Sequence, residues 1–232
     1  ARGRASRLSA GSMRTLPARP LKLLVLSLAL GMLPVGAALL PSRVAAHDAT
    51  TPAEEEAQRF LLEGLSLAAV NGPRQCVFSG TVEAIAALQE KLRGCDVDHR
   101  LLATANKAGH SHLMDPFLEE FRALLAGVRL HEPRIGYISN LHGDYVAPGQ
   151  LTDPDYWVRQ LRETVRFHDG LSRLLADPSA AFVEVGPPGH LSRLVPAGAQ
   201  RVDATSLPLR DPNASEIEHM LNSLGQLWTY GV

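Results

Sequence analysis

The sequence contains little cysteine and almost no net charge. Cys76 and Cys95 are its two cysteines, which are too few for a disulfide framework and indicate a reducing compartment such as the cytosol, although the sequence is compatible with one bridge between them. A formal net charge of −1 gives no basic surface of the kind that nucleic-acid binding requires. Internal repeats and low-complexity tracts are also lacking, and 45% hydrophobic residues are typical of an ordinary globular chain.

The N-terminal region is strongly patterned by comparison. Its first 22 residues carry six basic side chains and no acid, and an apolar run from residue 23 to residue 40 follows. This pattern is typical of a secretory signal peptide that ends near residue 46. However, Gly31, Pro34 and Gly36 interrupt the run, and it fits a buried strand about equally well. Both interpretations stay open for this segment, and the rest of the chain favours a cytoplasmic protein without a membrane span.

Residues 33–105 are predicted to form a small unit of strands and helices. Two β-rich runs at residues 65–70 and 75–79 are separated by the turn signal Asn71-Gly72-Pro73. A further strand is expected at residues 97–103. Strands packed under helices in this order suit a ferredoxin-like subdomain.

Two helices carry cap signals. Residues 81–93 place apolar side chains at helical spacing, with Thr81 as the N-cap and Gly94 as the residue that follows the helix. A second helix is expected to start at Asp115, with proline in its first turn, and to end at Gly127.

The remaining pattern alternates strands and helices. Strands are expected at residues 135–139 and 181–185, and a helix begins at Asp153, which is followed by proline. A last amphipathic helix is expected at residues 216–228. Together these elements predict an α/β fold.

The densest group of polar side chains holds two imidazoles, His110 and His112. As a nucleophile elbow, Gly-x-Ser-x-Gly, the run Gly109-His110-Ser111 fails, because Leu113 stands where the sharp turn needs a small residue. As metal ligands, the two histidines lack a third ligand at a supporting spacing. A third interpretation makes His110 a general base that serves a nucleophile elsewhere, and the alternative to it is a surface histidine without a function.

Six motifs are spread between residues 65 and 187. They are LSLAAVNGP (65–73), VFSG (77–80), HSHLMDP (110–116), SNLHG (139–143), DPDYWVRQLRETVRF (153–167) and FVEVGP (182–187). In this order and spacing they resemble the acyltransferase domains of modular (type I) polyketide synthases, members of the malonyl-CoA:acyl carrier protein transacylase family. The agreement of several separated motifs is far more specific than any one of them.

The resemblance, which extends over residues 33–195, implies an α/β fold made of a partial hydrolase-like acyltransferase core and a ferredoxin-like small subdomain. It implies the small subdomain at residues 33–105, the C-terminal part of the large subdomain at 106–195 and a post-acyltransferase linker at 196–232, and it leaves residues 1–32 unassigned. Malonyl-CoA is then the substrate and the phosphopantetheine thiol of an acyl carrier protein is the acceptor. The implied partners are that carrier protein and adjacent synthase domains, with no bound cofactor and no metal.

The resemblance also implies roles for single residues. His110 matches the family's histidine base, and Gln160 matches the position that orients the imidazole, although a polar residue on an exposed helix face would look the same. The three residues before this histidine carry selectivity in the family, usually as His-Ala-Phe or Tyr-Ala-Ser. Here they are Lys107, Ala108 and Gly109, and the neighbouring motifs favour a malonyl unit.

One part of the family pattern is missing. The sequence contains no Gly-His-Ser-x-Gly elbow, which would supply the serine nucleophile. Since the members of a catalytic unit act together, these 232 residues alone are predicted to be inactive, as a C-terminal fragment of the domain. The alternative is a non-catalytic relic or a scaffold that binds a carrier protein.

Overall fold

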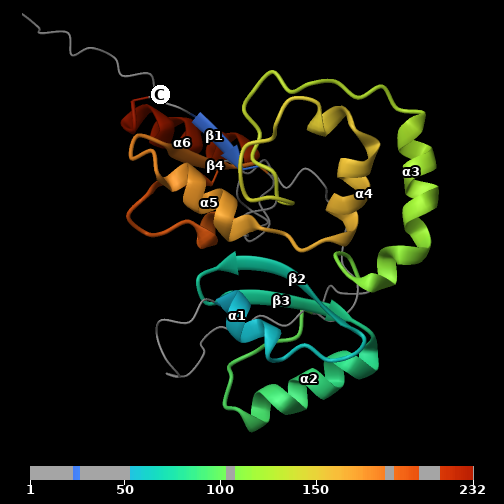
Figure 1. Cartoon of the computed structure of the whole chain (residues 1–232). Helices are drawn as coiled ribbons and strands as arrows, with labels where there is room; N and C mark the ends of the chain where they lie inside the picture. Colours follow the sequence, from blue (N-terminus) through green and yellow to red (C-terminus); the bar gives the residue numbers. More distant parts are fainter. Residues whose placement is uncertain (1–22, 27–52, 103–107, 186–190, 204–214, 232) are drawn as a thin grey trace, which may run out of the picture.

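The computed structural model describes residues 23–26, 53–102, 108–185, 191–203 and 215–231. Figure 1 shows two units. The smaller one contains α1 (Ala53–Gln58), β2 (Leu65–Gly72), β3 (Gln75–Gly80) and α2 (Val82–Gly94). The larger one contains a parallel sheet and the remaining helices.

The hairpin of the small unit forms where the sequence predicts it. β2 and β3 are antiparallel, with Leu65 opposite Gly80 and Gly72 opposite Gln75. The chain reverses at Pro73 and Arg74, and Gly72 still belongs to β2. The inward side chains of both strands form one hydrophobic core with α2, and this core includes Leu65, Leu67, Val70, Phe78, Ile85, Leu88 and Leu92.

Helix α2 starts as predicted and ends differently. Thr81 is its N-cap, and the threonine hydroxyl accepts a backbone N–H of the first turn at 3.2 Å. Gly94 is the last helical residue, however, and the left-handed residue after the helix is Asp96, with φ of 55°. The N–H of Val97 returns to the carbonyl of Leu92 at 3.0 Å, which closes a Schellman motif. An aspartate takes the place expected for glycine because a short polar side chain tolerates this conformation.

The strand expected at residues 97–103 is not formed over residues 97–102, where Val97 and Leu101 make only isolated bridges. Residue 103 lies outside the described part of the chain. The neighbour of β2 on its other side comes from the large unit instead, through a parallel bridge between Ala69 and Val165. The small unit therefore contacts residues 163–166 of the large unit, the segment between helices α4 and α5.

The sheet of the large unit is parallel, with β4 (Ala181–Glu184) between β1 (Leu23–Leu26) and β5 (Gln200–Asp203). All four residues of β4 are buried, which is usual for a strand covered on both faces. The strand predicted at 181–185 is confirmed, and the apolar run after residue 22 contributes β1. A linker was expected at residues 196–232, whereas residues 200–203 form β5 and extend the sheet.

Helix α5 (Phe167–Leu175) was not predicted. It packs Leu171 and Leu174 against Phe182 of β4 and against Val195. The loop of residues 135–146, which lies earlier in the chain, approaches α5 closely at Gly143, which has φ of 70° and where a Cβ would lie 2.3 Å from the Cβ of Asp169. The strand expected at residues 135–139 is replaced by this loop, which makes one isolated bridge between Ile138 and Tyr145.

The predicted helix from Asp115 starts later than expected. Ser111 caps a 3-10 turn, η1 (His112–Phe117), and α3 (Leu118–Ala126) follows and ends at Gly127 as predicted. The apolar face of α3 is not part of a core, because none of its residues is buried and Leu124 is 66% exposed.

Helix α4 (Pro154–Arg162) begins as predicted, with the Asp153 carboxylate accepting the N–H of Asp155 at 2.9 Å. A short 3-10 turn, η2 (Gln150–Thr152), precedes it. The final amphipathic helix is confirmed as α6 (Glu216–Thr229). Among the described residues, no helix has the length and apolar character needed to cross a bilayer.

The disulfide that the sequence allowed is not formed. Cys76 and Cys95 are both free thiols, the first buried in β3 and the second exposed after α2. Burial, followed by the charges of Glu54 and Glu56, raises the pKa of Cys76 to about 12. This thiol therefore acts as a small apolar core residue.

Candidate functional site

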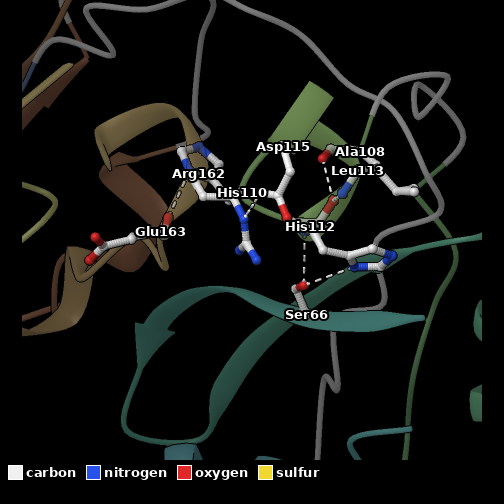
Figure 2. A network of polar contacts seen from close by, with 9 residues as sticks. Ser66, Ala108, His110, His112, Leu113, Asp115, Arg162 and Glu163 are labelled. Carbon is white, nitrogen blue, oxygen red and sulfur yellow. Dashed lines mark hydrogen bonds and ion pairs between the residues drawn. The ribbon is translucent and has the colours of Figure 1, made fainter. Parts of the chain in front are cut away.

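The candidate site lies where the loop before η1 meets the C-terminal end of α4 (Figure 2). His110 occupies the left-handed region with φ of 56°, a conformation that few residues other than glycine adopt. Its N–H donates to the carbonyl of Leu161 at 3.1 Å. Such strain persists only where surrounding contacts hold it, and it is found often at functional sites.

The imidazole of His110 is held by a main-chain carbonyl. Its Nδ1 lies 2.9 Å from the carbonyl oxygen of Glu163, the residue that caps α4. Because a carbonyl only accepts hydrogen bonds, Nδ1 carries the proton of the neutral ring and Nε2 is left with a free lone pair. The last carbonyls of a helix have no partner inside it and carry partial negative charge, so this helix end suits an imidazole donor.

The environment keeps His110 neutral. Burial lowers the pKa of its imidazole below the usual 6.5, and hydrogen bonds to the main chain at Glu163 and Gln160 offset part of this effect. An unprotonated Nε2 near neutral pH is what a general base needs. The contact of Nδ1 with the Glu163 carbonyl and the lowered pKa both favour an unprotonated Nε2 on His110.

Gln160 does not orient the ring with its side chain in this structure. Its side-chain oxygen Oε1 is buried and has no hydrogen-bond partner among the described residues. The carbonyl of Glu163, three positions later, fixes the tautomer. Gln160 lies in the last turn of α4, next to the group that contacts the imidazole. A main-chain carbonyl has no signal in the residue type, so sequence reasoning missed that group.

The hydroxyl of Ser111 forms hydrogen bonds with main-chain groups of its own loop. Its hydroxyl donates to the carbonyl of Ala108 at 2.6 Å and accepts the N–H of Leu113 at 3.2 Å, and its side chain is fully buried. This arrangement caps η1. The structure thus agrees with the sequence argument that Ser111 does not form a nucleophile elbow.

His112 faces β2 rather than a metal site. Its N–H donates to Oγ of Ser66 at 3.3 Å, and its Nδ1 lies 3.4 Å from the same oxygen (Figure 2). Within the described part of the chain, no group of three or more His, Cys, Asp or Glu side chains is arranged to hold a metal ion. An ion pair between Asp115 and Arg162 links η1 to the C-terminal end of α4.

Residues 163–166, the segment that carries the Glu163 carbonyl, are hydrogen-bonded to β2 of the small unit. The hydroxyl of Thr164 donates to the carbonyl of Leu67 at 2.7 Å. Val165 donates its N–H to Ala68 and accepts the N–H of Val70, both at 2.9 Å. Residues 163–166 thus lie beside β2 in the manner of a short extra strand.

The same segment ends in an ion pair. Arg166 forms two hydrogen bonds, of 2.6 and 2.8 Å, with the carboxylate of Glu54 on α1. The side chains are 34% and 33% exposed, so the pair is partly shielded from water. Neither the ion pair nor the threonine contact was predicted from the sequence, because their partners lie about one hundred residues apart in the chain.

The three positions predicted to set acyl selectivity are only partly described. Lys107 lies outside the described residues. Ala108 is 4% exposed and serves as the acceptor for Ser111. A Cβ built on Gly109 meets no other heavy atom within 4 Å, so this position leaves open space beside His110.

Comparisons with known proteins agree with this fold and with the motif order. The family model described as acyl transferase domain matches residues 37–232. The polyketide synthase GfsA of Streptomyces halstedii is 40% identical over 167 residues, which are 70% of this chain and 2% of that protein. The mycoketide-CoA synthase of Mycobacterium tuberculosis is 34% identical over 200 residues, which are 86% of this chain and 5% of that protein.

Solved structures give the same result. The acyl transferase domain of SpnD, in complex with 2-(pent-4-yn-1-yl)malonyl, has a TM-score of 0.74 and 33% identity, over 85% of this chain and 47% of that one. The acyl transferase domain of ZmaA has a TM-score of 0.73 and 31% identity, over 86% and 45%. A malonyl CoA-acyl carrier protein transacylase from Clostridium perfringens shares the fold at 16% identity, with a TM-score of 0.65 over 86% and 60%.

The chain spans about half the length of the two acyl transferase domains and a small share of the synthases. The match nevertheless covers most of the chain and includes the loop and the helix end that form the candidate site. This chain therefore belongs to the acyl transferase domain family of polyketide synthases.

Proposed function

We propose that this chain supplies the histidine base for transfer of a malonyl-type acyl group from coenzyme A to the phosphopantetheine thiol of an acyl carrier protein. The single observation that carries the proposal is the contact of 2.9 Å between Nδ1 of His110 and the carbonyl of Glu163, which leaves Nε2 free to accept a proton. The proposed partners are the carrier protein and adjacent synthase domains. A cytoplasmic location, where coenzyme A thioesters are found, belongs to the same proposal, and no bound cofactor takes part.

The base acts in both half-reactions. In the first, Nε2 of His110 takes the hydroxyl proton as a serine oxygen attacks the malonyl thioester, and the proton leaves with the coenzyme A sulfur. In the second, Nε2 takes the proton of the phosphopantetheine thiol as that sulfur attacks the acyl serine, and the proton returns to the serine oxygen. Each half-reaction exchanges one acyl bond for another, so one imidazole that first accepts and then donates the proton serves both directions.

The nucleophile is proposed to come from sequence other than these 232 residues. The sequence has no Gly-His-Ser-x-Gly motif, and the hydroxyl of Ser111 is occupied by the loop that it caps. We therefore expect the purified chain to form no covalent adduct when it is incubated with malonyl-CoA and analysed by intact mass spectrometry. A malonyl group located on Ser111 would contradict this assignment.

The role of His110 is tested in combination with the missing half. The chain is joined to the nucleophile-bearing half of a polyketide synthase acyltransferase domain, and malonyl transfer to a carrier protein is followed by mass spectrometry. His110→Ala should lower the transfer rate about 10²- to 10⁴-fold, the usual contribution of a general base. His131→Ala, at an exposed histidine outside the site, is the control and should leave the rate unchanged. Undiminished transfer by the His110 variant would overturn the proposal, and carrier binding without transfer would favour a scaffold.

Selectivity for malonyl is the finer part of the proposal and rests on the motif resemblance. The open space at Gly109 suits a test of it, because a Cβ added there meets no heavy atom within 4 Å. In competition between malonyl- and methylmalonyl-CoA, Gly109→Phe should raise the preference for malonyl by excluding the α-methyl group, an effect of about 10- to 200-fold at most for one methyl-sized difference. An unchanged ratio would remove Gly109 from the selectivity determinants.

A further inference from the structure

We propose that Thr164 is a positioning residue for His110: its hydroxyl fastens residues 163–166 to β2 and thereby keeps the carbonyl of Glu163 on Nδ1 of the imidazole. This inference rests on the proposed function, because it explains how the base is held ready. It assigns to the contact between the two units a role in the chemistry as well as in stability.

The first step of the argument is covalent proximity. The carbonyl that binds His110 belongs to Glu163 and lies in the same planar peptide unit as the main-chain nitrogen of Thr164. A displacement of Thr164 from β2 therefore moves the Glu163 carbonyl directly. Because a hydrogen bond weakens steeply as its angle departs from linearity, a small rotation of this peptide is enough to release the ring.

The second step is the place where Thr164 binds. Its Oγ1 donates to the carbonyl of Leu67 at 2.7 Å, where the pairing of β2 with β3 is irregular between Leu67 and Ala69. At such a bulge the regular hydrogen bonding between the two strands is interrupted. A main-chain carbonyl at this point can then accept a hydrogen bond from a side chain. The hydroxyl contact lies directly before the two main-chain hydrogen bonds of Val165 with β2.

The third step compares the other contacts that hold the site. The ion pair of Asp115 with Arg162 has side chains that are 53% and 33% exposed, and exposed ion pairs contribute little. Ser66 holds the neighbouring His112 and does not touch the imidazole of His110 or its carbonyl. The Glu163 side chain itself pairs with Arg159, but these side chains are 44% and 53% exposed, so this pair also contributes little. Thr164 thus makes the partly buried side-chain hydrogen bond that lies nearest to the orienting carbonyl.

The test is the tautomer of His110, measured by ¹⁵N NMR of the imidazole in the full 232-residue chain above the imidazole pKa. The native chain should show one tautomer, with the proton on Nδ1. Thr164→Val, which keeps the shape and removes the donor, should give a mixture of the two tautomers. Thr164→Ser, which keeps the hydroxyl, should restore the Nδ1–H form.

Thr152→Val is the matched control, since it removes another threonine hydroxyl, which donates to the carbonyl of Gly149 at 3.0 Å outside the site. It should leave the tautomer of His110 unchanged. If Thr164→Val does not fold, Glu54→Ala carries the test, because it loosens the same segment at Arg166, and it should also give a mixture. A His110 that keeps the Nδ1–H form in the folded Thr164→Val chain, or in Glu54→Ala in its place, overturns the inference.

This experiment separates the inference from the function on which it rests. One outcome is that Thr164→Val gives a mixture of tautomers while His110→Ala in the joined enzyme still transfers the acyl group at the full rate. This result would support the positioning role of Thr164 and refute the role of His110 as the base. The opposite outcome is that Thr164→Val keeps the Nδ1–H tautomer while His110→Ala loses acyl transfer. This result would support His110 as the base and refute the positioning role of Thr164.

Discussion

The ion pair between Glu54 and Arg166 offers a quantitative test of how the two units hold together. We consider a double-mutant cycle of Glu54→Ala, Arg166→Ala and both changes together. The cycle isolates the energy of interaction between the two side chains from their other contacts. The pair is bidentate, with N–O distances of 2.6 and 2.8 Å, which is the strong geometry for arginine and a carboxylate.

The magnitude follows from exposure. Exposed pairs contribute about 0.2–1 kcal/mol, whereas removing one partner of a buried pair costs about 3–5 kcal/mol. Side chains that are 34% and 33% exposed place this pair near the upper end of the exposed range. Asp169 lies 3.6 Å from the Arg166 guanidinium and compensates in part for a lost Glu54. We expect a coupling energy of about 1 kcal/mol.

The assay is urea unfolding followed by circular dichroism, at about 0.1 M and 1 M salt. The coupling should fall at high salt, because the Debye length shortens from about 10 Å to about 3 Å. A coupling below about 0.3 kcal/mol at low salt would refute the view that this ion pair fastens residues 163–166 to α1, since additivity within that limit is typical of independent sites. A coupling that does not respond to salt would show that electrostatic attraction is not its source.

Three further predictions concern the core, the pH dependence and the thiols. Leu88→Ala should lower the free energy of unfolding by about 2–5 kcal/mol, because this side chain is fully buried. Val82→Ala on the same helix is the control: this side chain is 77% exposed, and its loss should change the free energy of unfolding by less than about 0.5 kcal/mol. Equal effects of the two changes in urea unfolding would contradict the packing of α2. Because burial lowers the pKa of His110 in the folded chain, the unfolded chain binds the proton more readily, so stability should be lost as the pH falls below about 6.5. His110→Gln should remove that part of the loss between about pH 7.5 and 5.5 in urea unfolding, and an unchanged pH dependence would speak against a lowered pKa. Iodoacetamide should alkylate Cys95 in the native chain and reach Cys76 only after unfolding, because Cys76 is buried and its pKa is raised to about 12; native labelling of Cys76, found by peptide mass spectrometry, would refute its place in the core.

The contrast between predicted and missed elements has a physical cause. The hairpin, the starts of α2 and α4 and the buried strand β4 were predicted because each depends on local signals, such as the cap residues Thr81 and Asp153. The strand expected at residues 135–139 is not formed because a short apolar run becomes a strand only when a partner is available. Among the described residues, only Ile138 of this run forms a bridge, with Tyr145. The apolar face of α3 lies outside the hydrophobic cores, since spacing along a helix does not specify what lies opposite.

The sequence by itself determined the family, the α/β class and the position of His110, because ordered motifs and their spacing are properties of the chain. Only the tertiary structure decided how the imidazole is oriented. The orienting group is a main-chain carbonyl at Glu163, and its position depends on contacts of Thr164 with Leu67 and of Arg166 with Glu54, across about one hundred residues of sequence. Main-chain atoms are common to every residue, so folding alone decides which of them reaches the imidazole of His110.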